Sequence, residues 1–269
     1  MNDIHPTAQI DKTVNLGNGI SIGAFSVIRG YVDIGDNVVI STHVLVEGQK
    51  DGPTEIGDYT KIFSYATIGT MSQDLKWQEE RHNTGVKIGS HCNIREYVSI
   101  HSGTPASSGT TIGDRCSLLA YSHIGHDAEL GIGVVLSNSV QIAGHCILED
   151  DCIVSASSGV AQFIRIGNLS FIAGYSTVAS DVPPYSIVQG QLATFRTINR
   201  VGLNRSGVAR EEVLSISKSY DKIYNSDSPL LDNIKNLSKG QTSPYILNII
   251  DFIKKRSKNG ISKHSKMNV

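Results

Sequence analysis

The sequence has few aromatic residues, no long apolar run and no excess of one charge. Aromatic residues make up 6% of the 269 residues, and Trp occurs once. The 24 basic and 25 acidic side chains nearly cancel, so no basic excess indicates nucleic-acid binding. No apolar run approaches the roughly 18 residues that a membrane-spanning helix needs. Hydrophobic residues still reach 39%, which can fill a core and argues against a disordered chain.

Cysteine is also scarce. The four cysteines, Cys92, Cys116, Cys146 and Cys152, show no CxxC spacing, and a chain of this length needs no disulfide framework. We therefore expect four buried free thiols. The first residues, Met-Asn-Asp-Ile-His-Pro, lack the basic and then apolar form of a secretory signal, so we expect a cytoplasmic protein.

What the sequence has in excess is aliphatic residues at a six-residue period. It contains 32 isoleucines and 26 glycines. Steps of six from Ile4 find aliphatic side chains as far as Val46, and the series returns at Ile56 and at Ile88. The longest unbroken run has twelve members: Ile112, Leu118, Ile124, Leu130, Leu136, Ile142, Leu148, Val154, Val160, Ile166, Ile172 and Val178. Such a fixed period is typical of a solenoid.

Two positions in each six-residue unit predict the core. The first holds the large aliphatic residue, and the fifth is usually small or β-branched, as at Ser26, Ala66 and Cys116. Because side chains alternate in direction along a strand, positions one and five point inward. Glycine, Asn or Asp between the strands would allow the corners. The sequence therefore predicts a mainly β chain that folds as a parallel β-helix, in which each coil contacts only its neighbours.

Three segments interrupt the period: residues 47–55, 70–86 and 102–111. Insertions in a solenoid project from one face and often line its binding surface. We regard the first as a solvated turn and the other two as candidates for a functional site.

The repeat ends after Val182-Pro183-Pro184-Tyr185, and helical stripes follow over residues 208–225 and 246–253. We predict a β-helix over residues 1–190. A small helical domain with a basic tail, over residues 191–269, would cover the open end of the solenoid. We expect the tail, with Lys258 and Lys266, to be solvated and partly disordered.

The repeat resembles that of the hexapeptide-repeat acyltransferases over residues 4–190. In both, an aliphatic residue is followed by Gly, two variable residues and a small or β-branched residue. The resemblance implies a left-handed prism with three sides and 18 residues per coil, and it implies a homotrimer.

With 18 residues per coil, residues 18 apart stack about 4.8 Å from each other in adjacent coils. His126, Gly144 and Gln162 then form one column, and Asp127 and His145 form the next. His123 also points outward beside them. No Cys or Ser nucleophile lies in either column, so the arrangement indicates general-base catalysis, with His126 taking a proton and Asp127 fixing its tautomer.

A metal site is the alternative. His123, His126 and His145 would supply three imidazoles to zinc, and a carbonic-anhydrase class has this fold. That class resembles a pattern with two histidines five apart, whereas here the pair is three apart and followed directly by Asp127. We therefore predict no metal and no cofactor.

Six further motifs are similar to those of the UDP-N-acetylglucosamine O-acyltransferases, which catalyse the first step of lipid A biosynthesis. They are Ser72-Gln73-Asp74-Leu75-Lys76, Ile94-Arg95-Glu96-Tyr97-Val98-Ser99-Ile100-His101, His123-Ile124-Gly125-His126-Asp127, Ala143-Gly144-His145, Asp181-Val182-Pro183-Pro184-Tyr185 and Asn199-Arg200-Val201-Gly202-Leu203-Asn204-Arg205. Together they span nearly the whole chain.

This resemblance implies an enzyme that moves a 3-hydroxyacyl chain from acyl carrier protein to the 3-hydroxyl of UDP-N-acetylglucosamine. It implies that His126 is the base, that Asp127 orients it and that the Gly144 amide stabilises the oxyanion. Among the implied substrate-binding residues, Asp74, His123, His145 and Gln162 hold the sugar, Gln73 and Lys76 line the same cleft, and Asn199 and Arg205 hold the nucleotide. The acidic carrier protein would meet basic residues such as Arg200, Lys218 and Lys222, which equally suit a solvated surface.

Two departures from the family keep a second acceptor open. Ala161 stands where the family commonly has His, and Asn204-Arg205-Ser206-Gly207 replaces a more basic run. The alternative is a paralogue that acylates another nucleotide sugar, such as one that carries an amine at the acylated position.

The family's ruler for the acyl chain lies on the coil with Phe171-Ile172-Ala173-Gly174. Gly174 at its floor leaves room for a long chain, whereas Phe171 and Leu192 narrow the slot. We predict a 3-hydroxytetradecanoyl chain rather than a ten-carbon chain.

Overall fold

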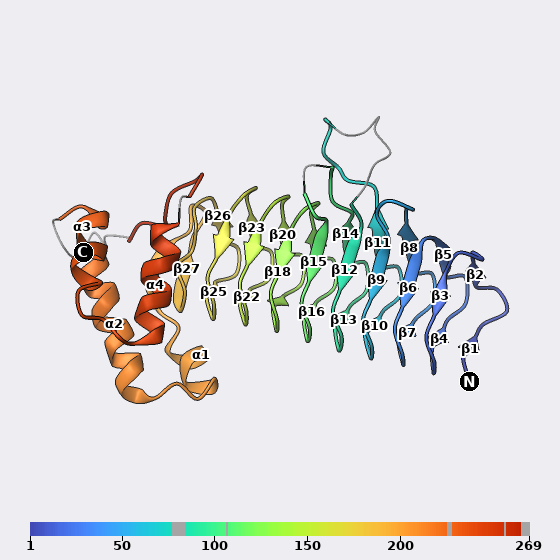
Figure 1. Ribbon diagram of the computed structural model, residues 1–269, viewed down its shortest axis with the longest axis horizontal. Helices are drawn as coiled ribbons and strands as arrows, with labels where there is room; N and C mark the ends of the chain where they lie inside the picture. The colour runs from blue at the N-terminus through green and yellow to red at the C-terminus, as the bar shows by residue number, and fades with distance from the viewer. Residues whose placement is uncertain (77–83, 106, 225–227, 256, 265–269) are drawn as a thin grey trace.

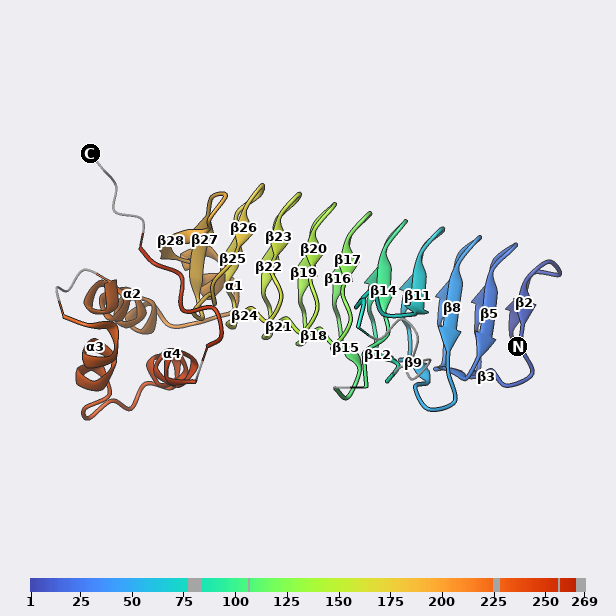
Figure 2. The ribbon, with the colours of Figure 1, turned by 90° about the horizontal axis from the view of Figure 1, so that it is seen from above.

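The structure is a computed structural model that describes residues 1–76, 84–105, 107–224, 228–255 and 257–264. It is a long stack of short strands with helices at one end and the N-terminus at the other (Figures 1 and 2). The strands form three faces of a prism, and nearly every strand pairs in parallel with strands one coil away. The predicted parallel β-helix is therefore confirmed.

We number the faces by their sheets. Face 1 contains β1 (Asp3–Ile4), β4 (Ser21–Ile22), β7 (Val39–Ile40), β10 (Lys61–Ile62), β13 (Asn93–Ile94), β16 (Ser117–Leu118), β19 (Val135–Leu136), β22 (Ile153–Val154), β25 (Phe171–Ile172), β27 (Ser186–Gln189) and β28 (Thr194–Ile198). Face 2 contains β2 (Gln9–Ile10), β5 (Val27–Gly30), β8 (Leu45–Gly48), β11 (Thr67–Thr70), β14 (Ser99–His101), β17 (His123–Ile124), β20 (Gln141–Ile142), β23 (Gly159–Val160) and β26 (Thr177–Val178). Face 3 contains β3 (Asn15–Leu16), β6 (Val32–Ile34), β9 (Thr54–Ile56), β12 (Val86–Ile88), β15 (Thr110–Ile112), β18 (Glu129–Leu130), β21 (Ile147–Leu148) and β24 (Arg165–Ile166).

The interior follows the predicted positions. Ile94 at position one and Val98 at position five are both fully buried, and in the first coil Ile4 is exposed because no coil covers it. All four cysteines are buried and free, as expected. Strand partners in uninterrupted coils lie 18 residues apart, as do Ser117 and Val135.

The corners differ from the expectation of glycine, Asn or Asp. Most fourth positions carry another residue type in the left-handed conformation, such as Tyr97 at φ 61° and His145 at φ 60°. A left-handed residue with a Cβ costs about 1–2 kcal/mol, so the packing of the coils imposes this conformation. Glycine is needed elsewhere, where coils approach closely: a Cβ on Gly125 would lie 2.7 Å from the Gly144 nitrogen.

One corner, between faces 1 and 2, carries a continuous stack of rings. Consecutive ring centroids lie 4.8–5.1 Å apart. We call this stack the corner row; its members are Phe25, His43, Tyr65, Tyr97 and Tyr121. Its aromatic members remain 46–58% exposed on this single chain.

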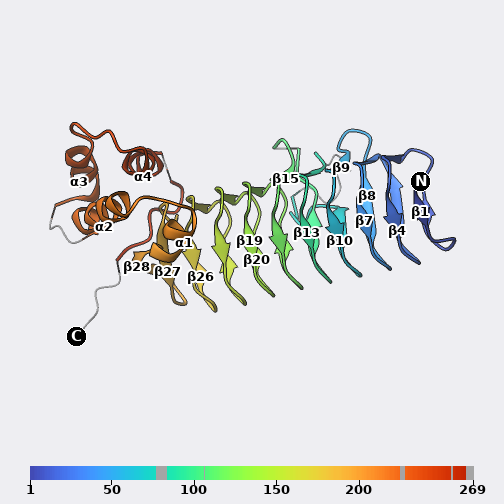
Figure 3. The same cartoon turned by 90° about the horizontal axis from the view of Figure 1, so that it is seen from below.

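The helices pack at the end of the prism, beyond β27 and β28 (Figures 1 and 3). They are α1 (Arg200–Arg205), α2 (Arg210–Tyr224), α3 (Leu230–Leu237) and α4 (Pro244–Lys254). The predicted apolar stripes are buried in a second core, with Ile216 and Ile249 fully covered. The exact division at residue 190 stays a prediction. No helix among the described residues is both long and apolar enough to cross a membrane.

The expectation of a solvated tail holds only in part: Lys258 and Lys263 are exposed, but the backbone of residues 260–264 packs against the last coil. The backbone of Ile261 pairs in parallel with that of Asp181, and the backbone of His264 pairs with that of Phe195. Ser262 is 2% exposed. The segment packs because its backbone continues the hydrogen bonding of the last coil. Arg256 and Lys266 lie outside the described residues.

Candidate functional site

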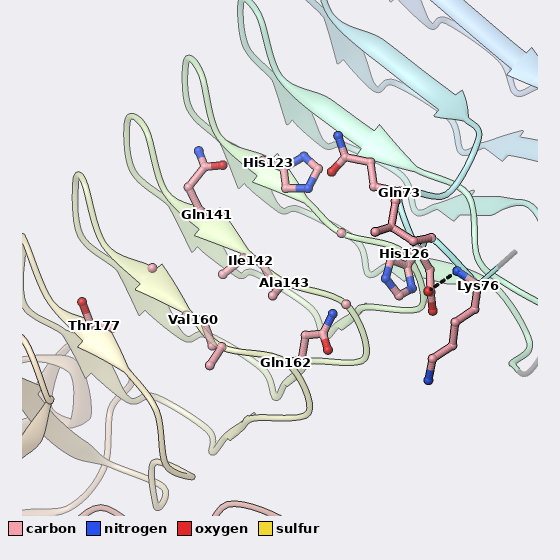
Figure 4. A pocket seen from close by; sticks show the side chains of 16 residues that line it. Gln73, Lys76, His123, His126, Gln141, Ile142, Ala143, Val160, Gln162 and Thr177 are labelled. Atoms are coloured by element: carbon pink, nitrogen blue, oxygen red, sulfur yellow. Dashed lines mark hydrogen bonds between the residues drawn. The ribbon is translucent and has the colours of Figure 1, made fainter. Parts of the chain in front are cut away.

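A pocket of about 670 Å³ lies along face 2. Strands β17, β20, β23 and β26 form its floor, and the described part of the first long insertion forms a wall (Figure 4). Seven predicted site residues line it: Gln73, Asp74, Lys76, His123, His126, Gly144 and Gln162. The 18-residue register therefore brings together side chains that are far apart in the sequence.

One wall of the pocket contains His126, whose imidazole is paired with the Asp127 carboxylate behind it. His126 Nδ1 lies 2.7 Å from Asp127 Oδ2, and the two residues are only 5% and 4% exposed. The bond at Nδ1 leaves Nε2 as the nitrogen available to a ligand. The ring also lies against the next coil, because a Cβ on Gly144 would come within 2.6 Å of His126 Nε2. Only glycine fits at that position.

The second long insertion folds onto Asp127. Its Oδ1 accepts the Thr104 N–H at 2.7 Å, its Oδ2 accepts the Thr104 hydroxyl at 3.0 Å, and the Ser107 hydroxyl donates to Oδ1. Burial alone would raise the pKa of Asp127, but the bonds from His126, Ser107 and Thr104 hold that pKa below its usual value. The carboxylate is therefore kept ionised. Neither Thr104 nor Ser107 belongs to the predicted motifs, although both lie in the second long insertion.

Three other imidazoles surround His126. His145 Nε2 lies 3.5 Å from Asp127 Oδ2, His123 Nδ1 lies 2.8 Å from Ser99 Oγ, and the His101 ring stands edge-on to His123 at 5.0 Å. Burial, followed by neighbouring imidazoles, lowers the pKa of His123 and lowers that of His101 to about 4. Burial also lowers the pKa of His145, although Asp127 opposes that shift. These rings are therefore neutral at pH 7 and can accept protons or hydrogen bonds.

Other predicted residues lie elsewhere. Phe171, Asn199 and Arg205 line a second cavity of about 750 Å³, on face 1. The Asn199 side chain is already used, because its oxygen accepts the Gly202 N–H and its nitrogen donates to the Leu169 carbonyl.

Gly174 and Leu192 are not brought to either cavity. Leu192 is 75% exposed, and the basic residues Arg200, Lys218 and Lys222 are exposed on the helices. Within one chain, the predicted ruler residues therefore do not line a common cavity.

The metal alternative has a different geometry from the one expected. Ligand atoms of His126, Asp127 and His145, rather than the three predicted histidines, lie within 4.8 Å of one another. However, Asp127 already accepts four hydrogen bonds from the chain, which use both lone pairs of each oxygen. A cation there would have to displace one of those donors, so this donor set is a poor metal site.

Comparisons with known proteins agree with the geometry. Residues 181–262 match a family model described as "Udp N-acetylglucosamine O-acyltransferase; Domain 2". Acyl-[acyl-carrier-protein]–UDP-N-acetylglucosamine O-acyltransferases are similar along the sequence. That of Synechocystis is 41% identical over 77% of this chain and 74% of its own, and that of Campylobacter lari is 37% identical over 100% and 99%.

Solved structures of UDP-N-acetylglucosamine acyltransferases are similar too. That from Francisella novicida has a TM-score of 0.92 at 32% identity and covers 98% of this chain and 95% of its own. That from Campylobacter jejuni has a TM-score of 0.90 at 34% identity, with coverage of 97% and 100%.

Proposed function

Because the chain belongs to the UDP-N-acetylglucosamine O-acyltransferase family, we propose that it transfers a 3-hydroxyacyl chain from acyl carrier protein to the 3-hydroxyl of UDP-N-acetylglucosamine. This reaction is the first step of lipid A biosynthesis. The observation that carries the proposal for this chain is the buried His126–Asp127 pair, of which His126 lines the face 2 pocket. We further propose that the enzyme works in the cytoplasm and needs no cofactor.

His126 acts as the general base. Asp127 accepts a hydrogen bond from the His126 Nδ1–H. Nε2 is then the unprotonated nitrogen, and its lone pair faces the acceptor sugar. As Nε2 takes the proton of the sugar 3-hydroxyl, that oxygen attacks the thioester carbonyl. The carbon–sulfur bond then breaks, and the imidazolium gives the proton to the departing thiolate, which leaves as the thiol of the carrier protein. Ionised Asp127 stabilises the imidazolium between the two steps.

The Gly144 amide stabilises the oxyanion. Among the residues that the structure describes, no protein acceptor takes the Gly144 N–H, and the residue borders both the pocket and the His126 ring. A free backbone donor beside the base suits the charge that develops on the carbonyl oxygen. One such donor contributes about 3–4 kcal/mol in well-studied acyl transfer.

The acceptor sugar is held by Asp74, His123, His145 and Gln162, with Gln73 and Lys76 beside them. The neutral imidazoles supply hydrogen bonds without net charge, and Lys76 supplies a positive charge for a phosphate. Exposed Arg205 suits the diphosphate of the nucleotide, while Asn199 shapes that site by capping α1. Arg200, Lys218 and Lys222 attract the acidic carrier protein.

The enzyme is a homotrimer with sites between its subunits. The imidazoles lie on face 2, whereas Asn199 and Arg205 lie beside face 1. The two faces of one chain diverge from their shared corner, so face 1 of a neighbouring copy must supply the second half of each site. Around a threefold axis, the exposed corner row would be buried between copies, which supports this arrangement.

Light scattering tests the assembly. We expect about three times the 29.0 kDa chain mass and a loss of the trimer when Tyr97→Asp and Tyr121→Asp are combined. A monomer mass for the unchanged chain would rule out the shared site.

A different nucleotide sugar is the second candidate. Ala161 lines the face 2 pocket and Ser206 lines the face 1 cavity, so both departures from the family touch a proposed substrate site. An acceptor with an amine at C3 would be acylated on nitrogen by the same base and amide donor.

The decisive experiment is an assay with purified 3-hydroxyacyl carrier protein and a panel of UDP-sugars, including the 3-amino analogue. We expect the highest kcat/KM with UDP-N-acetylglucosamine. Preference for the 3-amino sugar would select the second candidate. No transfer to any sugar, together with stoichiometric zinc in the purified protein, would favour the metal-binding alternative.

A further inference from the structure

The loop of residues 102–109 makes contacts that a surface insertion does not need. Thr104 is 1% exposed and gives both its N–H and its hydroxyl to the Asp127 carboxylate. Ser107 gives its hydroxyl to Oδ1 and in turn accepts the Gly109 N–H. The Asp127 side chain is consequently sealed from solvent and meets a donor at each lone pair.

The loop is shaped to come this close. A Cβ on Gly103 would lie 2.7 Å from Asp127 Oδ1 and 2.6 Å from the Gly109 Cα, so a side chain there would push the loop off the carboxylate. Gly109 itself adopts φ 109°, a conformation that L side chains rarely take. The two glycines therefore let the loop turn back onto the corner.

The insertion of residues 70–86 is hydrogen-bonded to the insertion of residues 102–111. The Thr84 hydroxyl donates to the Thr104 carbonyl at 3.1 Å, and the Thr84 N–H donates to the Gly103 carbonyl at 3.3 Å. Thr84 belongs to the same insertion as Gln73 and Lys76, which line the pocket. The described parts of the two insertions thus form one unit around the His126–Asp127 pair.

We propose that Thr104 and Ser107 are positioning residues for the acyl transfer, which hold the Asp127 carboxylate in the one orientation that fixes His126 as the base. The proposal rests on the proposed function of His126. Three bonds from the loop leave Oδ2 only the His126 Nδ1–H to accept as a fourth partner. Without them the carboxylate can rotate, and the ring loses its fixed tautomer and direction.

The loop also sets how strongly Asp127 attracts a proton. Donors at a carboxylate reduce its basicity, so removing one strengthens the pull of Asp127 on the His126 Nδ1–H. His126 then becomes easier to protonate, and activity is lost at a higher pH on the acid side. Other titratable groups face this pair, and a test must leave them unchanged: His101, His123 and His145 act on the pair directly, and Asp74 and Lys258 act on His145.

The test compares pH–rate profiles of the full-length enzyme for Thr104→Val, Thr104→Ser and Ser107→Ala. We expect Thr104→Val and Ser107→Ala each to lower kcat about 10-fold, the low end for a hydrogen bond to a charged group. The KM for the sugar should change little, and the acid limb should move to higher pH. Thr104→Ser restores the hydroxyl and should restore both kcat and the limb.

Ser102→Ala is the matched control. Its hydroxyl is buried in the same loop but donates to the Thr70 carbonyl, away from Asp127, so its profile should match that of the unchanged enzyme. An acid limb that stays fixed in Thr104→Val, or a kcat loss that Thr104→Ser fails to restore, would overturn the positioning role. His126→Ala is measured alongside: if it stays active, the proposed base is wrong, and if it alone is inactive, only the role of the loop is wrong.

Discussion

Two corners of one coil show how this fold separates structure from chemistry. Tyr121 and Asp127 lie six residues apart, both in the left-handed conformation, at φ 64° and 61°. Tyr121 stands in the bare corner between faces 1 and 2 and is 57% exposed, whereas Asp127 lies under an insertion and is 4% exposed. The coil imposes the same backbone on both. What covers the corner decides whether its side chain is left open, as at Tyr121, or is held beside the pocket, as at Asp127.

We call the corner of Asp127, which the insertion covers, the covered corner. Substitutions there should lower kcat far more than substitutions in the exposed corners. His126→Ala removes the base and should lower kcat at least about 100-fold while the protein stays folded. His145→Ala should have a milder effect that acts partly on the KM for the sugar. Tyr59→Ala, in a bare corner far from the pocket, serves as the control. Steady-state assays with a circular dichroism check decide the matter, and near wild-type turnover in His126→Ala would refute the assignment.

Within the covered corner, charge should matter apart from shape. Asp127→Asn keeps the size of the side chain but replaces an acceptor with an amide that can turn its NH₂ toward His126 Nδ1. We expect kcat to fall by roughly 10- to 100-fold, the value of a hydrogen bond to a charged group. The same assay checks this variant. An unchanged kcat would mean that the tautomer of His126 does not depend on Asp127.

The same contrast explains what the sequence could predict. Periodicity fixes the inward positions and the columns, so the meeting of His126, Gly144 and Gln162 follows from their spacing of 18 residues. The contact of Thr104 with Asp127 does not follow from any period, because a loop returns to the prism by its own turns. A weak signal existed: the stretch Ser102-Gly103-Thr104 supplies two hydroxyls and a glycine directly after a strand that borders the site.

Two other features were beyond the reach of periodicity. Position four of each six-residue unit carries many residue types, because the packing of the coils imposes its conformation. Residue preferences alone therefore predicted the wrong residue type at most corners. The basic composition of residues 257–264 suggests solvent, and Lys258 and Lys263 are exposed, yet the backbone at Ile261 and His264 pairs with Asp181 and Phe195. Lys258 Nζ lies 3.6 Å from the centre of the Phe163 ring, and that ring stacks on His145.

The covered corner should also weaken the fold in acid. His101 has a pKa lowered to about 4 by burial, then by His123 and His126. The unfolded chain takes up a proton near pH 6.5, so stability that is present above that value is lost as the pH falls toward about 4. His101→Gln should reduce this loss, giving a Tm at pH 5 that falls less from its pH 7 value, by about 2–4 °C.

Differential scanning fluorimetry at both pH values measures this change. His91→Gln is measured at both values as the control, because it removes an imidazole that stacks on Tyr59 in a bare corner. A parallel shift in His101→Gln would instead show that this imidazole contributes only packing.

Gly144 and Gly174 both stand at the third position of a six-residue unit, and their surroundings bear on the length of the acyl chain. A Cβ on Gly144, in the covered corner, would strike His126, whereas a Cβ on Gly174, beside the bare corner, would meet only Ala156 O at 3.4 Å and Ser155 Cβ at 3.9 Å. Gly174 therefore tolerates a side chain, and we predict that it forms the floor of the acyl slot in the trimer. The unchanged enzyme should prefer 3-hydroxytetradecanoyl carrier protein over the ten-carbon substrate.

Gly174→Leu should move that optimum to a shorter chain. Each methylene that fits is worth about 0.8 kcal/mol, or roughly 4-fold in rate, so the optimum should be sharp. Rates with carrier-protein substrates of ten to sixteen carbons measure it, and Gly174→Ala should cause a smaller shift in the same direction. Phe171 lies on the neighbouring strand and lines the face 1 cavity, so it is the competing floor. An optimum at ten carbons that moves upward in Phe171→Ala would assign the floor to Phe171, because excluded volume can be relieved only at the residue that supplies it.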